Sequence, residues 1–524
     1  MTSASIAETG SPVRSPAQGM ERRLLVVAGV FTIAYAAVLV MQSSLTSFYT
    51  LDDPYIHLAL AENIARGHFG VNPSEASNPS SSILWPWLMA AFKPLGLMLW
   101  APLLVNIAAF LATLNVIFEY TVRTLAPQGR DPSNALILVG LAVFSYNLFG
   151  VVFTGMEHSL HTLVSVLAIT RILDKRYDRL ALVACVASPL LRFEGVLVLG
   201  FCLVAAIVDR KFVFAAVAFA LAAAVIGAYE VMLAGLGLPA LPSSVLAKSH
   251  ISAGVVAGGH GELRSVLASL WRNLHALDAP MYGLFAAVLL YAIAVRRGRD
   301  RLIAAGMFGM LAVFLTIHAR DAWARYDVFL FCIETVACIH LLRDPLQRLL
   351  TRRAATWTLA GTLVVMNAAL GLFVLVASPL AAGNINAQQH QMHRFVTGCW
   401  KGPIAVNDLG WTSFRNDQYV LDLAGLGNET ARRARLAGGY EWMAAMAASH
   451  HVDAAAIYPE WFDGVPESWV HVGDLLLTEP KITPAEARVA FYATRPAAAG
   501  RVRTCLDWLA SDLPAGARID LTAP

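Results

Sequence analysis

Two adjacent carboxylates, Asp52 and Asp53, stand at the start of the segment LDDPYIHLALAENIARGHFG, residues 51–70. Proline directly after Asp53 predicts that a helix begins here, with Asp53 as its N-cap and Pro54 as its first residue. If Asp53 caps the helix, Asp52 is left to accept a proton or to bind a cation. Repulsion between neighbouring carboxylates raises the proton affinity of one of them. The alternative is that both acids only start the helix.

The predicted helix carries two further polar side chains that suit substrate binding, Tyr55 and His57. Ile56, Leu60 and Ile64 lie four residues apart and form an apolar stripe. Such a stripe predicts a helix that lies on the membrane surface. The acidic pair would then stand at the rim of the membrane.

Four short motifs place charged or aromatic side chains in or beside apolar runs, where charge is expensive and indicates function. They are Glu157 and His158 in TGMEH, Arg192 and Glu194 in LLRFEG, Lys248 in LPSSVLAKSH, and Arg320, Arg325 and Tyr326 in HARDAWARYD. Simpler explanations are a structural ion pair between Arg192 and Glu194, and basic side chains that touch lipid headgroups.

Other kinds of chemistry find little support. The 14 histidines show no metal-ligand spacing, and there is no Walker loop and no strand followed by GxGxxG. The net charge of +3 is small and the arginines are scattered, which argues against a nucleic-acid partner.

The composition is that of a membrane protein. Hydrophobic residues make up 57% of the 524 residues and charged residues 14%, with a mean hydropathy of +0.58, whereas soluble domains are about 25% charged. Residues 1–20 predict a disordered cytoplasmic tail, residues 21–379 a helical multi-spanning domain, and residues 380–524 a water-soluble domain. The spans are expected at 22–42, 98–122, 134–152, 158–173, 212–236, 281–295, 302–318, 327–342 and 355–379.

Lys and Arg clusters fall in the short loops between these spans, and such clusters mark the cytoplasmic side. With the clusters inside, the charged motifs and everything after residue 380 face outward. Residues 180–208 have basic flanks at both ends and are interrupted around Pro189. Two short helices that dip into the membrane and return would place Arg192 and Glu194 at their outer turn. Residues 83–97 are expected to form a similar short element.

The outward tail shows an α/β pattern, with strand-like residues 404–406, 419–423 and 452–458 and amphipathic stretches within 429–449. Cys399 and Cys505 both lie in this tail. Because disulfides persist outside the cytoplasm, we expect these two cysteines to pair.

Several motifs, taken in order, resemble the GT-C superfamily of membrane glycosyltransferases, and its arabinofuranosyltransferase-like branch in particular. They are DDPY in the first outward loop, NPSEASNPSSSILWPWL at 72–88, TGMEHSL at 154–160, SPLLRFEG at 188–195, LPSSVLAK at 241–248 and VNDLGWTSFRNDQYVLDLAGLGN at 406–428. The chain departs from the pattern at Phe193, where relatives often have proline, and at Ser243 and Ser244, where Asn-Thr is common.

The resemblance implies an α-helical polytopic GT-C-like bundle with a C-terminal α/β domain, in the cytoplasmic (inner) membrane. It further implies a polyprenyl-phosphate sugar donor and a glycan or lipid acceptor outside that membrane. On this basis we expect direct, inverting displacement with Asp52 as the general base. Lys248, Arg192 and Arg325 would stabilise the leaving phosphate, and Glu157 and Glu194 would orient hydroxyl groups.

No cofactor is assigned. The superfamily contains both metal-dependent and metal-free members, so a divalent cation remains open, with Asp53 as its candidate ligand. The main alternative function is a transporter or flippase for a lipid or polar solute, which would use the same charges as a pathway. A third reading is a carbohydrate-binding module on a membrane anchor.

Overall fold

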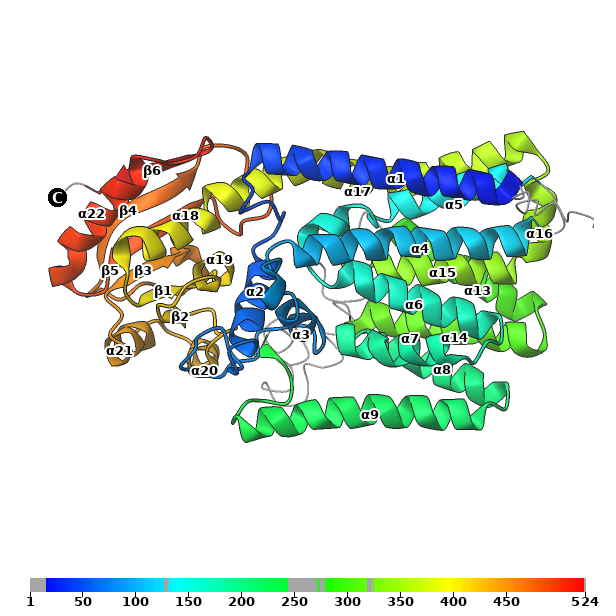
Figure 1. Ribbon diagram of the computed structural model, residues 1–524, viewed down its shortest axis with the longest axis horizontal. Coiled ribbons are helices and arrows are strands. Elements are labelled where there is room, and N and C mark those ends of the chain that lie inside the picture. Colours follow the sequence, from blue (N-terminus) through cyan, green and yellow to red (C-terminus); the bar gives the residue numbers. More distant parts are fainter. Residues whose placement is uncertain are drawn as a thin grey trace, which may run out of the picture.

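The computed structural model describes residues 16–126, 131–243, 271, 273, 279–317, 323 and 325–522. Helices running along the long axis form a bundle, and a mixed α/β domain lies at one end of it (Figure 1). The helices of the bundle are α1 Pro16–Gln42, α4 Ala101–Leu125, α5 Ser133–Ser145, α6 His158–Leu173, α7 Arg179–Leu191, α8 Gly195–Val208, α9 Phe212–Gly235, α13 Ala279–Val295, α14 Gly298–Ile317, α15 Val328–Leu341, α16 Arg343–Leu349 and α17 Arg353–Ala387.

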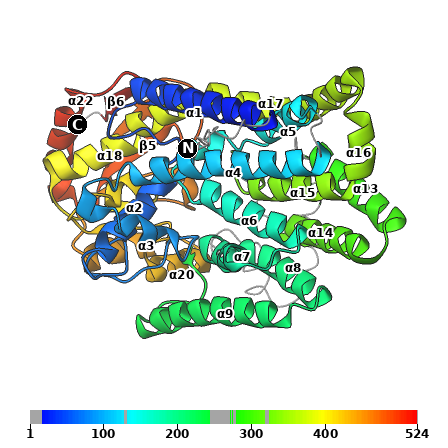
Figure 2. The same cartoon turned by 45° about the vertical axis from the view of Figure 1, so that its right-hand side comes forward.

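Three of the described helical segments are long and apolar enough to cross a membrane by length and composition: Gly19–Gln42, Ala101–Leu125 and Phe212–Gly235. Helices α1 and α17 lie side by side along one edge of the bundle, and α9 lies at the opposite edge (Figures 1 and 2). The predicted architecture of a helical membrane bundle with a soluble C-terminal domain is confirmed.

The predicted interruption of residues 180–208 is present. Helix α7 ends at Leu191 and α8 begins at Gly195, so that Arg192 lies in the turn with an extended backbone. A Cβ on Gly195 would lie 2.2 Å from the carbonyl oxygen of Ser188, which leaves room only for glycine. The hydroxyl of Ser188 lies 3.1 Å from that of Ser165 on α6, and such polar contacts tie helices together in lipid.

The expected span over 134–152 is wrong at its C-terminal end. Helix α5 stops at Ser145, Asn147 adopts a left-handed conformation with φ of 64°, and a 3₁₀ turn covers Gly150–Thr154. The asparagine side chain donates a 2.7 Å hydrogen bond to the carbonyl of Trp323, which ties this break to the segment before α15. Residues 83–97 form the short helix α3, Trp85–Ala90, and a 3₁₀ turn, Lys93–Leu95.

The helix after the acidic pair, α2 Asp53–Ile64, does not lie on an open membrane surface. Nine of its twelve residues are buried, and the C-terminal domain packs on it through α19 Gly410–Ser413. The apolar stripe was identified correctly, but the polar positions between its members are covered too, because protein rather than water lies on the other side.

The C-terminal domain is built on a six-stranded sheet with strand order β2-β1-β3-β5-β4-β6. Strands β1 Ile404–Val406, β2 Val420–Asp422 and β3 Ala454–Ile457 were predicted and pair in parallel. Strands β4 Val470–Leu477, β5 Arg488–Ala493 and β6 Ala517–Leu521 were not predicted and pair antiparallel. The domain's remaining helices are α18 Gln389–Arg394, a π-helical turn Phe395–Trp400, α20 Glu429–Ala437, α21 Trp442–Ser449 and α22 Ala499–Ala510, with 3₁₀ turns at Pro459–Trp461 and Pro496–Ala498.

The edge of the sheet at β2 is covered by the loop that follows α2. The side chain of Asn72, in the loop after α2, donates to the carbonyl of Val420 and accepts from its amide, both at 2.9 Å. One asparagine side chain thus replaces a neighbouring strand at the edge of β2. Tyr419 adds a 2.8 Å hydrogen bond to Glu75 of the same loop.

Cys399 and Cys505, which were expected to pair, form a disulfide that closes a sequence separation of 106 residues. It joins the π-helical turn before β1 to α22, and therefore ties the two ends of the domain together.

We predict that the double variant Cys399→Ser/Cys505→Ser loses about 2–5 kcal/mol of unfolding free energy, because the unfolded chain regains the entropy that the cross-link removes. Thermal and denaturant unfolding in detergent would measure the loss. Dithiothreitol should destabilise the wild type and leave the double variant unchanged; equal sensitivity of both proteins would contradict the prediction.

Candidate active site

The acidic pair lies where the bundle meets the C-terminal domain. Asp52, and not Asp53, is the N-cap residue of α2, and no side-chain hydrogen bond caps this helix. Asp53 and Pro54 are the first two helical residues. The expectation that Asp53 caps the helix was wrong, since proline fits either position of a first turn whose amides have no intrahelical partner.

Asp52 binds the C-terminal domain instead of being free. Its two carboxylate oxygens accept hydrogen bonds from the backbone amides of Gly410, at 2.7 Å, and Trp411, at 2.9 Å. Burial, and then the neighbouring carboxyl of Asp408, raise the pKa of Asp52 well above its usual value. A buried carboxyl group with both oxygens bound to backbone amides is poorly placed to take a proton from a substrate hydroxyl.

Asp53 faces a different environment. Its side chain is 34% exposed and forms a 2.8 Å ion pair with Arg325. Arg325 also donates a 3.3 Å hydrogen bond to the hydroxyl of Tyr326. The structure therefore brings together an accessible carboxylate and a guanidinium group from two of the predicted motifs.

Arg192 occupies the centre of the neighbouring contacts. It pairs with Glu157 at 2.7 Å and with both oxygens of Glu194 at 2.8 and 3.2 Å. One of its nitrogens also lies 3.0 Å from Nε2 of His158, and its guanidinium lies 4.6 Å from the ring centre of Tyr326. Two carboxylates thus compensate its charge.

These contacts form one connected set of side chains, which we call the charged cluster. It comprises Asp53, Glu157, His158, Arg192, Glu194, Arg325 and Tyr326. The members come from α2, from the start of α6, from the turn between α7 and α8, and from the segment before α15. Residues that are far apart in the sequence and were predicted to share one side of the membrane therefore meet at one end of the bundle.

The remaining predicted site residues lie elsewhere. Tyr55 is fully buried, with its ring centre 4.2 Å from that of Trp411, and His57 is buried with Nδ1 3.1 Å from the Ser80 hydroxyl. Tyr55 thus packs in the interface behind the acidic pair, and His57 contacts the loop after α2. Lys248 and Arg320 lie outside the described residues.

Asp408 and Gln389 are site residues that the sequence analysis missed. Asp408 follows β1, within a motif that was noted only as part of the family resemblance. Its position after the first strand of the α/β domain is the signal that could have indicated it, because side chains at strand ends lie where ligands and partners bind.

The described residues contain no preformed ligand set for a divalent cation. Among them, no three His, Cys, Asp or Glu side chains gather as a ligand set, and Asp53, the expected ligand, already carries a guanidinium group at 2.8 Å. Hard cations require several oxygen ligands. We therefore assign no reaction step to a metal ion.

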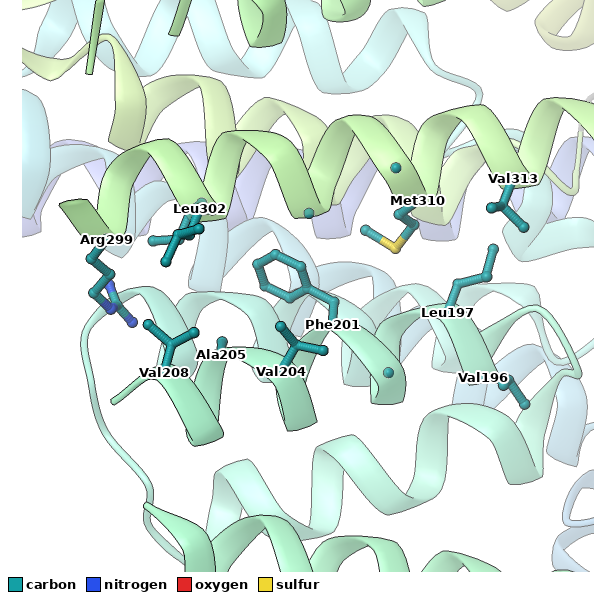
Figure 3. A pocket seen from close by; sticks show the side chains of 14 residues that line it. Val196, Leu197, Phe201, Val204, Ala205, Val208, Arg299, Leu302, Met310 and Val313 are labelled. Atoms are coloured by element: carbon teal, nitrogen blue, oxygen red, sulfur yellow. The ribbon is translucent and has the colours of Figure 1, made fainter. Parts of the chain in front are cut away.

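An apolar groove of about 270 Å³ runs between α8 and α14 (Figure 3). It begins at Val196 and Leu197, in the first turn of α8, and extends to Val208 and Arg299 at the other end of that helix. Its walls are aliphatic apart from Phe201 and Arg299, and glycines at 200, 306 and 309 widen it. One end of the groove therefore lies at the start of α8, whose N-cap residue is Glu194 of the charged cluster, and the groove follows α8 to its other end.

Solved structures resemble almost the whole chain. The apo oligosaccharyltransferase of Archaeoglobus fulgidus is 12% identical, with a TM-score of 0.50 over 95% of this chain and 76% of that chain. The chain therefore has a GT-C fold. ArnT from Cupriavidus metallidurans, bound to undecaprenyl phosphate, is 11% identical, with a TM-score of 0.49 over 92% of this chain and 99% of that chain. A mutant form of the arabinofuranosyltransferase AftD from Mycobacteria is 14% identical, with a TM-score of 0.47 over 90% of this chain and 42% of that chain.

Sequence comparison adds little to this result. A family model described as a domain of unknown function, DUF8728, matches residues 383–492, which lie in the C-terminal part of the chain. No curated protein matches the sequence.

We predict that Arg192→Gln lowers the unfolding free energy by about 3–5 kcal/mol, because it leaves the fully buried Glu157 without its cation. Adding Glu157→Gln should restore part of the loss, since the two side chains act as one unit. Thermal unfolding of the purified variants measures both effects.

The matched control is Arg66→Gln, whose guanidinium forms exposed ion pairs with Glu62 and Asp417. It should cost less than about 1 kcal/mol. If Arg192→Gln were as mild as this control, the central role of Arg192 would be wrong.

Proposed function

We propose that the chain is a membrane glycosyltransferase that moves a sugar from a polyprenyl-phosphate donor to a hydroxyl group of a glycan or lipid acceptor. The observation that carries this proposal is that the charged cluster and the apolar groove share the start of α8. A lipid-linked donor has the same two parts, since a charged phosphate and sugar are joined to a long hydrocarbon chain.

The reaction is a single displacement at the anomeric carbon. The acceptor oxygen forms a bond to this carbon while the bond from carbon to the phosphate oxygen breaks, so that polyprenyl phosphate leaves and the configuration inverts. The acceptor hydroxyl loses its proton to a carboxylate. Asp53 takes this role in place of Asp52, because its carboxylate is partly exposed whereas that of Asp52 is buried and bound to two amides.

Negative charge develops on the departing phosphate and needs a cation aimed at it. Arg325 suits this task better than Arg192, since a planar guanidinium can bind phosphate oxygens in pairs and Arg192 is already engaged by two carboxylates. Glu157 and Glu194 hold Arg192, and Lys248 remains a second candidate cation.

The groove between α8 and α14 supports a lipid-linked donor. Within the membrane, hydrocarbon is the material that fits an aliphatic groove, and the end of the groove nearest Glu194 leads to the charged cluster. Clusters of Lys and Arg at the opposite end of the bundle support placing the charged cluster and the C-terminal domain on the outer side of the cytoplasmic membrane.

We predict that Asp53→Asn lowers transfer by a factor of roughly 100 to 10,000, because the amide keeps the size of the base without its basicity. The assay measures release of polyprenyl phosphate from a panel of polyprenyl-phosphate pentoses and hexoses. Asp417→Asn, which changes an aspartate that is 82% exposed and pairs with Arg66, is the control and should keep full activity. If Asp53→Asn were fully active, the base would be elsewhere.

A second prediction concerns the groove. Gly200 and Gly309 line it, and an added Cβ at either position meets no atom within 4 Å. Leucine at each position should therefore fill the groove without a clash in the bundle. We expect a higher KM for long-chain donors and little change for donors with one or two isoprene units.

Gly283→Leu on α13 is the matched control, because its Cβ also meets no atom within 4 Å and it lies outside the groove. A loss that is equal for long and short donors, or equal in the control, would contradict a role for the groove in binding the donor chain.

A further inference from the structure

The contact between the C-terminal domain and the acidic pair contains a second carboxyl group. Asp408 follows β1, and its side chain accepts hydrogen bonds from Gln389 Nε2 and the Tyr458 hydroxyl, both at 2.9 Å. Its carboxyl group also lies within hydrogen-bonding reach of that of Asp52, across the interface between the domain and the bundle. A buried aspartate of the bundle and a partly buried aspartate of the C-terminal domain therefore meet directly beside Asp53.

A hydrogen bond between two carboxyl groups requires a proton on one of them. Without it, two negative charges would face each other in a buried site, where their repulsion is strong. The proton belongs to the pair rather than to either residue. In contrast, the amides of Gly410 and Trp411 can bind Asp52 in either state of the pair.

We propose that Asp408 is a positioning residue, and that the proton it shares with Asp52 holds the C-terminal domain on the start of α2 and thereby fixes Asp53. This inference rests on the proposed function only in its final step, the role of Asp53. Asp53 is the next residue to Asp52, so a displacement of Asp52 moves the candidate base.

The described groups around Asp52 and Asp408 supply no positive charge that could replace the shared proton. Among the described residues, the titratable side chains that face the pair are Asp53 and Tyr55 from α2 and Tyr458 from the C-terminal domain. None of these three is a cation, and the ion pair of Arg325 is with Asp53. Loss of the proton would therefore place two carboxylates in contact, with a third beside them.

Burial raises the pKa of both Asp52 and Asp408. For carboxyl groups whose pKa is higher in the folded state, protonation stabilises the folded contact at low pH, and this stabilisation is lost as the pH rises through the folded-state pKa. The docked arrangement is thus expected to weaken on the alkaline side.

The first experiment requires no enzymatic assay. Hydrogen exchange of the full-length protein, corrected for the intrinsic rate at each pH, gives protection factors for the amides of Gly410 and Trp411. We expect these protection factors to fall as the pH rises, while those of β1 and β3 stay constant. If the protection factors of Gly410 and Trp411 stay as constant as those of β1 and β3 across the pH range in which the protein stays folded, the proposal is overturned.

Asp408→Asn tests the proton itself, because its amide group donates a permanent hydrogen bond to Asp52. We expect the fall in protection, and the alkaline limb of the rate profile, to move to higher pH by at least about one unit. Asp422→Asn is the matched control, a buried aspartate of the same domain bound by backbone amides. An equal shift in this control would overturn the proposal.

The variant Gly410→Ala serves as a reference in which the C-terminal domain does not dock on the start of α2. Its Cβ would lie 2.3 Å from an oxygen of Asp52, so protection of the interface should be low at every pH. If Asp408→Asn shifts the exchange profile but no transfer is detected in any variant, the proposed function fails while the shared proton stands. If transfer is robust and neither profile shifts, the inference alone fails.

Discussion

The arrangement of this protein depends on how buried negative charge is compensated where the bundle meets the C-terminal domain. Five carboxylates gather there, on Asp52, Asp53, Glu157, Glu194 and Asp408, against two guanidinium groups in the described residues. Each acid has its own compensation: a guanidinium group, backbone amides, or a proton. Uncompensated charge at the buried positions, Asp52 and Glu157, would cost several kcal/mol. Segments from five regions of the chain therefore meet in one geometry.

This constraint also separates the roles of two neighbouring residues. Asp52 and Asp53 have the same side chain and differ by one helical position, yet one points into the domain interface and the other towards Arg325. The rotation of about 100° between consecutive helical residues is enough to give them different surroundings. Asp53 is thereby placed at the proposed reaction site and Asp52 at the domain interface. Because the two residues are adjacent, a movement of Asp52 also moves Asp53.

Much of the fold followed from the sequence because lipid restricts the available structures. Apolar runs located most of the helices, and the basic flanks of residues 180–208 predicted the broken pair α7 and α8. The charged motifs were identified because charge is costly in such runs. The roles within the acidic pair were not predictable, since they depend on Gly410 and Trp411, more than 350 residues away. Strands β4 to β6 were missed. Strand β6 lies at an edge of the sheet and has no buried residue, and β4 has an irregularity between His471 and Gly473. The burial of β5, with four of six residues buried, does not explain why it was missed.

The asparagine at position 72 has a consequence for the independence of the C-terminal domain. Because its side chain satisfies both backbone groups of Val420, the edge of β2 is complete only when the bundle is present. Separated from the bundle, the domain would expose an unpaired strand edge, and such edges recruit other chains. Cutting the chain between the bundle and the C-terminal domain would therefore not release a well-behaved soluble domain. The isolated domain would self-associate through the exposed edge of β2.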